Sequence, residues 1–100
     1  MTMAKKIEWN KTMHEFRALL DANSIIWYDC SDINPDCMFC MLRTHFTYLN
    51  AKWSVIIGTY SYGYEQNKLE LMCSKVNDGE PIGYLTPKEA IDIVLRGSYK

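Results

Sequence analysis

Hydrophobic residues recur at helical spacing near the start of the chain. Thr12 and Glu15 have the three-residue spacing of a capping box, which predicts that a helix begins at Thr12. Asn23 is expected to end this helix in the left-handed conformation. One apolar helix face follows from residues spaced three and four apart: Met13, Phe16, Leu19 and Leu20.

A second helix is predicted near the end of the chain. Thr86 is a capping residue, Pro87 suits the first helical position, and Glu89 completes a capping box. Gly97 is expected to end the helix. Its predicted buried stripe consists of Ala90, Ile91, Val94 and Leu95.

The segment between the helices is rich in β-branched and aromatic residues that alternate with polar ones, which predicts strands. A turn at Asn50–Ala51 joins two of them into a hairpin, and residues 29–40 are expected to form a loop. Trp53 and Tyr84 are expected to pack in the core. A short strand is predicted at 25–28, and the predicted strands of the sheet are 44–49, 53–60, 69–73 and 81–85.

These elements predict an α+β fold with a three- to four-stranded antiparallel sheet and both terminal helices packed on one face. One hundred residues with 48% hydrophobic and 23% charged positions fit a single domain, 1–100. Residues 1–11 are expected to be flexible. A homodimer is left open.

Net charge is −1, so the chain as a whole has no electrostatic reason to bind nucleic acid or an anionic membrane directly. Lys5 and Lys6 are not followed by the apolar stretch of a secretory signal. No run of apolar residues approaches the roughly 20 that a membrane span needs. We therefore expect a cytoplasmic protein.

The four cysteines are candidate zinc ligands: Cys30, Cys37, Cys40 and Cys73. Cys37 and Cys40 form a C-x-x-C knuckle, but a second such pair is missing. We expect reduced thiols without metal and no cofactor, with a zinc-stabilised structural module as the alternative.

No motif of an activated nucleophile, metalloprotease or dinucleotide site occurs, so we expect a non-enzymatic protein. The histidines are His14 and His45, and His45 is expected on the outer sheet face. A Cys40–His45 pair stays open. A small-ligand protein that sequesters a nucleotide signal is a further alternative, and it would need convergent basic residues such as Arg43, Lys52 and Lys68.

The best candidate binding surface is a loop with a tyrosine at every second position, followed by an acidic residue: Tyr60, Tyr62, Tyr64 and Glu65. Tyrosine among Ser, Gly and Asn is typical of adaptable protein-binding surfaces. One or two of these rings folding back onto the sheet is the structural alternative. Three aspartates of the acidic loop are added as neighbours: Asp29, Asp32 and Asp36.

Several segments together resemble small uncharacterised proteins of phages and prophages of clostridia-like Gram-positive bacteria. The segments are 43–46, 53–58, 61–63, 69–72 and 81–86 leading into Glu89 and Ala90. The resemblance implies no activity. It implies a host-protein partner, such as a nucleic-acid-binding defence enzyme, and an inhibitor of the anti-CRISPR kind.

Overall fold

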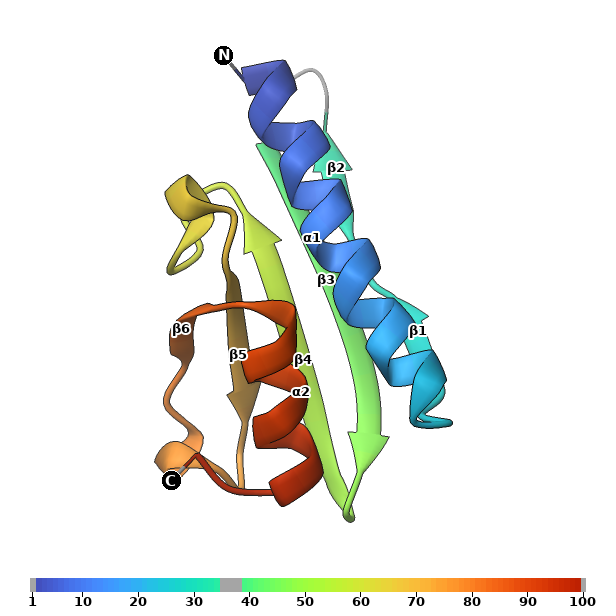
Figure 1. Cartoon of the computed structure of the whole chain (residues 1–100). Helices are drawn as coiled ribbons and strands as arrows, with labels where there is room; N and C mark the ends of the chain where they lie inside the picture. The colour runs from blue at the N-terminus through green and yellow to red at the C-terminus, as the bar shows by residue number, and fades with distance from the viewer. Residues whose placement is uncertain (1, 35–38, 100) are drawn as a thin grey trace.

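The computed structural model describes residues 2–34 and 39–99, and the side chains of residues 8–33 and 40–99. The elements along the chain are α1 (Thr2–Ala22), β1 (Trp27–Asp29), β2 (Asp32–Asn34), β3 (Phe39–Tyr48), β4 (Ala51–Gly58), the 3-10 turn η1 (Tyr64–Gln66), β5 (Leu69–Cys73), the 3-10 turn η2 (Asn77–Gly79), β6 (Ile82–Leu85) and α2 (Pro87–Arg96). The predicted α+β class is therefore confirmed (Figure 1).

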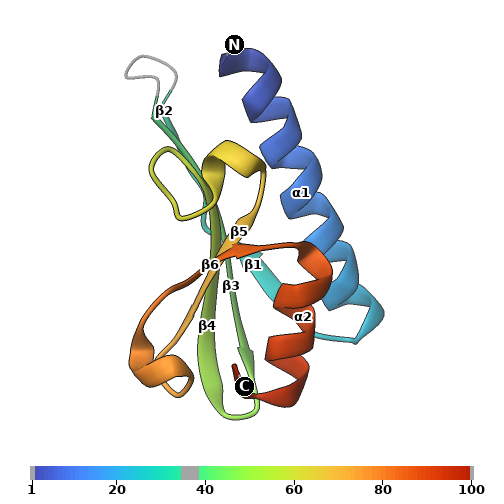
Figure 2. The same cartoon turned by 60° about the vertical axis from the view of Figure 1, so that its left-hand side comes forward.

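The sheet is antiparallel, with strand order β1-β3-β4-β5-β6, and β2 pairs with the same edge of β3 as β1 does. Within the described residues it has six strands, so the predicted three to four was too few. Residues 29–40 were expected to be a loop, but they contain β2 and the start of β3. Both helices lie on the same side of the sheet, which leaves the other face open (Figure 2).

Helix α1 begins at Thr2, so the predicted start at Thr12 is wrong. The Thr12 hydroxyl does not cap the helix; it donates to the Asn67 carbonyl oxygen, 3.1 Å away. One turn earlier, Trp9 is buried and extends the apolar stripe toward the N-terminus. The buried residues of α1 are spaced four, three and four apart: Trp9, Met13, Phe16 and Leu20.

The left-handed residue after α1 is Ser24, with φ of 59°, one position beyond the predicted Asn23. The Ile25 N–H returns to the Leu20 carbonyl at 2.9 Å, and the Ser24 N–H to Asp21 at 3.0 Å. These bonds satisfy the last carbonyls of the helix and direct the chain into β1.

The hairpin turn between β3 and β4 is formed by Leu49 and Asn50, one residue before the predicted position. Both have left-handed backbones, with φ of 53° and 59°, as a type I′ turn requires. Leucine is unusual there. A Cβ added at Gly97 would lie 2.8 Å from the Leu49 Cδ1, so this side chain packs over the end of α2.

Helix α2 confirms the capping box of Thr86 and Glu89 and the left-handed Gly97. Its predicted stripe is wrong at one position, since Leu95 is 36% exposed while Ile93 is buried. The helix lies over β5 and β6 and beside α1 (Figure 1), and its buried residues are Ala90, Ile91, Ile93 and Val94.

Alternation along the long strands separates the core from the open face. Cys40, Leu42 and Phe46 of β3 are buried under the helices, as are alternate residues of β4. Trp53 is buried as expected, and its ring stacks on Phe46 at a centroid distance of 6.1 Å. His45 is exposed on the open face, which confirms that prediction.

Candidate functional site

The tyrosine loop, residues 59–68, leaves β4 through a tight turn. The Ser61 N–H donates to the Gly58 carbonyl at 3.0 Å, and the buried Ser61 hydroxyl donates to the same oxygen. Tyr60 stands in this turn with φ of 70°, a conformation that a bulky residue seldom adopts. The Thr59 N–H donates to Cys40, which ties the turn to β3.

Tyr62 is held at three points of its backbone and Cβ. Its N–H donates to a Glu70 carboxylate oxygen at 2.8 Å, and its carbonyl accepts from the Tyr84 N–H at 3.3 Å. A Cβ at Gly83 would overlap the Cβ of Tyr62, so β6 and the loop are in direct contact there. The backbone and Cβ of Tyr62 are therefore held in place, while its ring extends into solvent.

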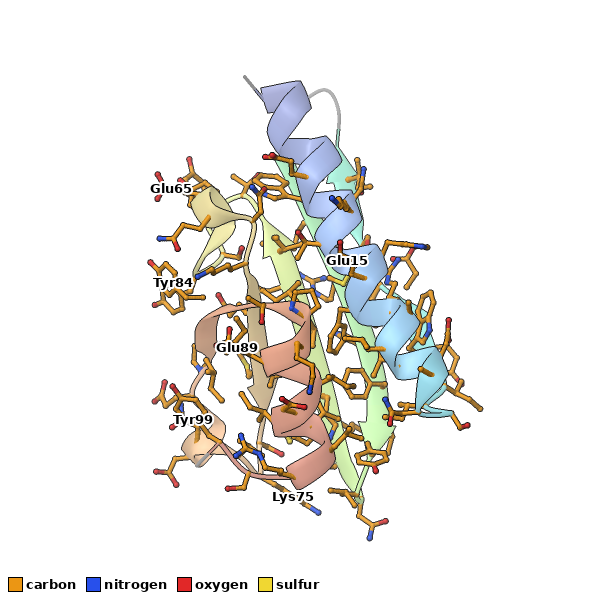
Figure 3. The ribbon with its side chains drawn as sticks, in the orientation of Figure 1. Glu15, Glu65, Lys75, Tyr84, Glu89 and Tyr99 are labelled. Carbon is orange, nitrogen blue, oxygen red and sulfur yellow. The ribbon has the colours of Figure 1, made fainter. Side chains whose placement is uncertain are left out.

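Three tyrosine side chains project from this region. Tyr60 is 82% exposed, and Tyr62 and Tyr84 are each 55% exposed. We call these three residues the tyrosine surface. Figure 3 shows Tyr84 and Glu65 on the same outer side of the molecule, away from α1. The rings, on one loop and the adjoining edge strand, expose amphipathic side chains with hydroxyl tips.

Tyr84 was expected in the core, and that prediction is wrong. The pairing of β5 with β6 shifts register between Leu69 and Leu71, and Tyr84 has φ of 60°. This irregularity breaks the alternation, so Ile82 is buried while Tyr84 turns outward. Gly83 was the available signal, because a glycine within a strand often marks a bulge or a close backbone approach.

Tyr64 lies differently from the other loop tyrosines. It is partly buried against the core, and its ring meets Trp9 of α1 edge-on at 6.2 Å. The Trp9 indole N–H donates to the Tyr64 carbonyl at 2.9 Å. The Tyr64 ring therefore folds back toward the core, as the structural alternative for this loop expected. It also contacts the Tyr60 ring, with 6.3 Å between the ring centroids.

The acidic residues do not form one cluster. Glu65 is exposed in η1. Asp32 of β2 pairs with Met41 of β3, and Met41 pairs on its other side with Gly58 of β4. Gly58 immediately precedes the tyrosine loop. Asp32 thus lies at the same end of the sheet as this loop, while Asp36 lies outside the described residues.

Asp29 pairs with Thr44 and points toward the helix side. Its carboxylate accepts from Ser31 and, at 3.1 Å, from the Arg17 guanidinium, which also donates to the buried Thr44 hydroxyl at 2.7 Å. The guanidinium lies 4.7 Å from the centre of the Trp27 ring. Asp29 therefore helps to fix α1 to the sheet edge, which is a structural role.

Stability should depend on Asp29 in acid. The Ser31 hydroxyl and N–H, and then the Arg17 charge, hold the pKa of Asp29 below its ordinary value of 3.8. A lowered folded pKa gives a stabilising contribution that is complete above 3.8 and is lost as the pH falls through the folded value. The Tm difference between the protein and Asp29→Asn should be constant above about pH 5 and shrink toward about pH 2. A difference that stays the same over this range would contradict the assignment.

The described cysteines do not converge on one site. Cys40 is buried at one end of β3, and Cys73 pairs with Trp53 near the other end of β4, about 20 Å away by strand rise. Cys37 lies outside the described residues. Within the described part of the chain, no three His, Cys, Asp or Glu residues are grouped to hold a metal. The four-cysteine zinc site is therefore contradicted by the positions of Cys40 and Cys73.

Two other residue sets are also separated. Cys40 and His45 lie on opposite faces of β3, five residues apart, so they form no catalytic pair. Arg43 and Lys52 share the open face but stand about 13 Å apart along the strands. Lys68 lies beside Gly63 and near Glu89 of α2.

No family model, curated protein or solved structure matches this chain. Among the described helices, none is both long enough and apolar enough to cross a membrane.

Proposed function

We propose that this protein acts without catalysis, by binding another protein through the tyrosine surface and Glu65. The observation that carries the proposal is the exposure of Tyr60, Tyr62 and Tyr84 on backbone that is fixed by hydrogen bonds and close packing. Large aromatic side chains near the centre of an interface usually supply most of its binding energy.

Rigidity favours binding through this surface. The Tyr62 N–H and carbonyl are both bonded within the protein, and the turn before it is closed by Ser61. The surface therefore loses little conformational freedom on association, and a smaller part of the contact energy is spent on ordering the loop.

Charge favours a basic partner. Glu65 is exposed within the tyrosine loop, and Asp32 is exposed at the same end of the sheet. Carboxylates at the rim of an interface select partners of opposite charge and speed their association. A groove that binds nucleic acid is positively charged, as such a partner would be. Together with the resemblance to phage proteins, this leads us to propose a host defence nuclease as the class of partner, bound as an anti-CRISPR protein would bind it.

A site-specific photo-crosslinker tests the proposal. With p-benzoylphenylalanine in place of Tyr62, irradiation in lysate of a clostridia-like Gram-positive bacterium should give one dominant adduct with a basic host protein. The same group in place of Ile26 is the matched control, because Ile26 is 75% exposed and precedes β1 at the opposite edge of the sheet. Adducts at both positions, or at neither, would contradict the proposal.

A further inference from the structure

The open face of the sheet carries a second, chemically different set of side chains. Cross-strand pairing places four residues in one row across β1, β3, β4 and β5: Tyr28, His45, Ser54 and Met72. The row spans three strand spacings, about 14 Å. On the same face, Thr47 pairs with Lys52, two residues from His45 and Ser54 along the strands. Ser74 directly follows Cys73, which pairs with Trp53.

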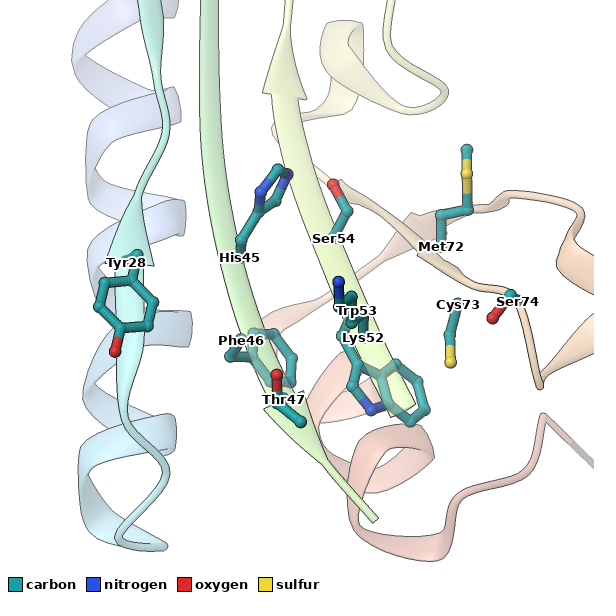
Figure 4. A pocket seen from close by; sticks show the side chains of 10 residues that line it. All are labelled: Tyr28, His45, Phe46, Thr47, Lys52, Trp53, Ser54, Met72, Cys73 and Ser74. Carbon is teal, nitrogen blue, oxygen red and sulfur yellow. The ribbon is translucent and has the colours of Figure 1, made fainter. Parts of the chain in front are cut away.

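These residues line a shallow pocket of about 370 Å³ in the open face (Figure 4). Tyr28 stands at one rim on β1, and Met72 stands at the other on β5. The volume lies within the range of small-molecule sites. The pocket lies toward the β3–β4 hairpin, while the tyrosine loop extends from the other end of β4, so the two sites are separate.

The polar groups of the pocket are not used within the protein. In the described part of the chain, no hydrogen bond or ion pair is formed by the side chains of His45, Thr47, Lys52, Ser54 and Ser74. None of the described residues that line the pocket carries a carboxylate. Glu70, further along this face, is already bonded to the Tyr62 N–H. The pocket therefore offers a cation and several hydroxyls to an acceptor, with an aromatic ring and a thioether at its rims.

We propose that this pocket binds a free nucleoside phosphate. The base would stack on the exposed Tyr28 ring, and the phosphate would lie toward Lys52, His45 and the hydroxyls. Bases of any kind stack on aromatic side chains, and lysine binds phosphate as a point charge. A free nucleotide is favoured over a nucleic-acid strand because the pocket is small and the chain has a net charge of −1.

The test is titration of the ¹⁵N-labelled protein with adenosine and guanosine monophosphates, adenosine, inorganic phosphate and a single-stranded decanucleotide. A monophosphate should shift the amide signals of His45 and Ser54. Lys52→Gln and Tyr28→Ala should each weaken its binding at least about tenfold. The matched control is Lys88→Gln, which makes the same chemical change on α2 and should leave the affinity unchanged. Thermal melting of each variant verifies that it is folded.

Each other outcome decides against the proposal. Absence of binding by either monophosphate would overturn it, as would binding that is insensitive to both pocket substitutions. Inorganic phosphate binding as tightly as the monophosphates would exclude base stacking. Tighter, salt-dependent binding of the decanucleotide would indicate a nucleic-acid surface in place of a nucleotide pocket.

Discussion

Replacing Leu20 by alanine should lower the free energy of unfolding by about 2–5 kcal/mol and the Tm by roughly 10 °C or more. Leu20 has no exposed surface and lies on the inner face of α1, within the core that joins both helices to the sheet. Truncation removes its apolar contacts and leaves a cavity that close-packed neighbours fill only in part.

Leu95→Ala is the matched control for this substitution. It removes the same atoms from α2, but Leu95 is 36% exposed and its change should cost less than about 1 kcal/mol. Urea denaturation of the three proteins measures both values. Equal losses at Leu20 and Leu95 would show that the two helices do not present these faces to the sheet.

The elements that were predicted correctly carry complete local signals. Thr86, Pro87, Glu89 and Gly97 specify both ends of α2 within twelve residues. Strand β4 alternates apolar and polar residues from Ala51 to Val55 and contains three β-branched residues, and β5 begins with the alternation Leu69, Glu70, Leu71. Such patterns need no distant partner, because capping bonds and face-to-face alternation are formed by neighbours in sequence.

The errors occur where distant residues decide the structure. Thr12 resembles a helix start, but Asn67 accepts its hydroxyl and Tyr64 packs on Trp9, so tertiary contacts extend α1 toward the N-terminus. β2 contains three residues, too few to show a period, and it exists because β3 offers it an edge.

The same distinction applies to the site. An alternating row of tyrosines identified the loop, but the row alone does not reveal which ring faces inward. Trp9 is 55 residues from Tyr64 in sequence, and its contact turns that ring toward the core. The outward turn of Tyr84 depends on a bulge opposite β5. The open-face pocket requires the register of four strands, which the sequence does not specify by itself.

The double variant Tyr60→Ala/Tyr62→Ala should weaken partner binding by at least about 100-fold, since truncation of an interface hot spot costs about 2 kcal/mol or more. It should stay folded, because alanine retains the Tyr62 Cβ that contacts Gly83 and the N–H bonded to Glu70. Both rings are mostly in solvent, so their loss removes little buried surface.

The most direct test of the tyrosine surface uses the partner protein that the crosslink identifies, purified without the crosslink. Its Kd is measured for this double variant, for the unmodified protein and for Ile26→Ala. We predict an unchanged Kd for Ile26→Ala and a loss of at least about 100-fold for the double variant, with a Tm within a few degrees of the unmodified protein. A normally folded double variant that binds with unchanged Kd would contradict the proposal that this surface is the binding site.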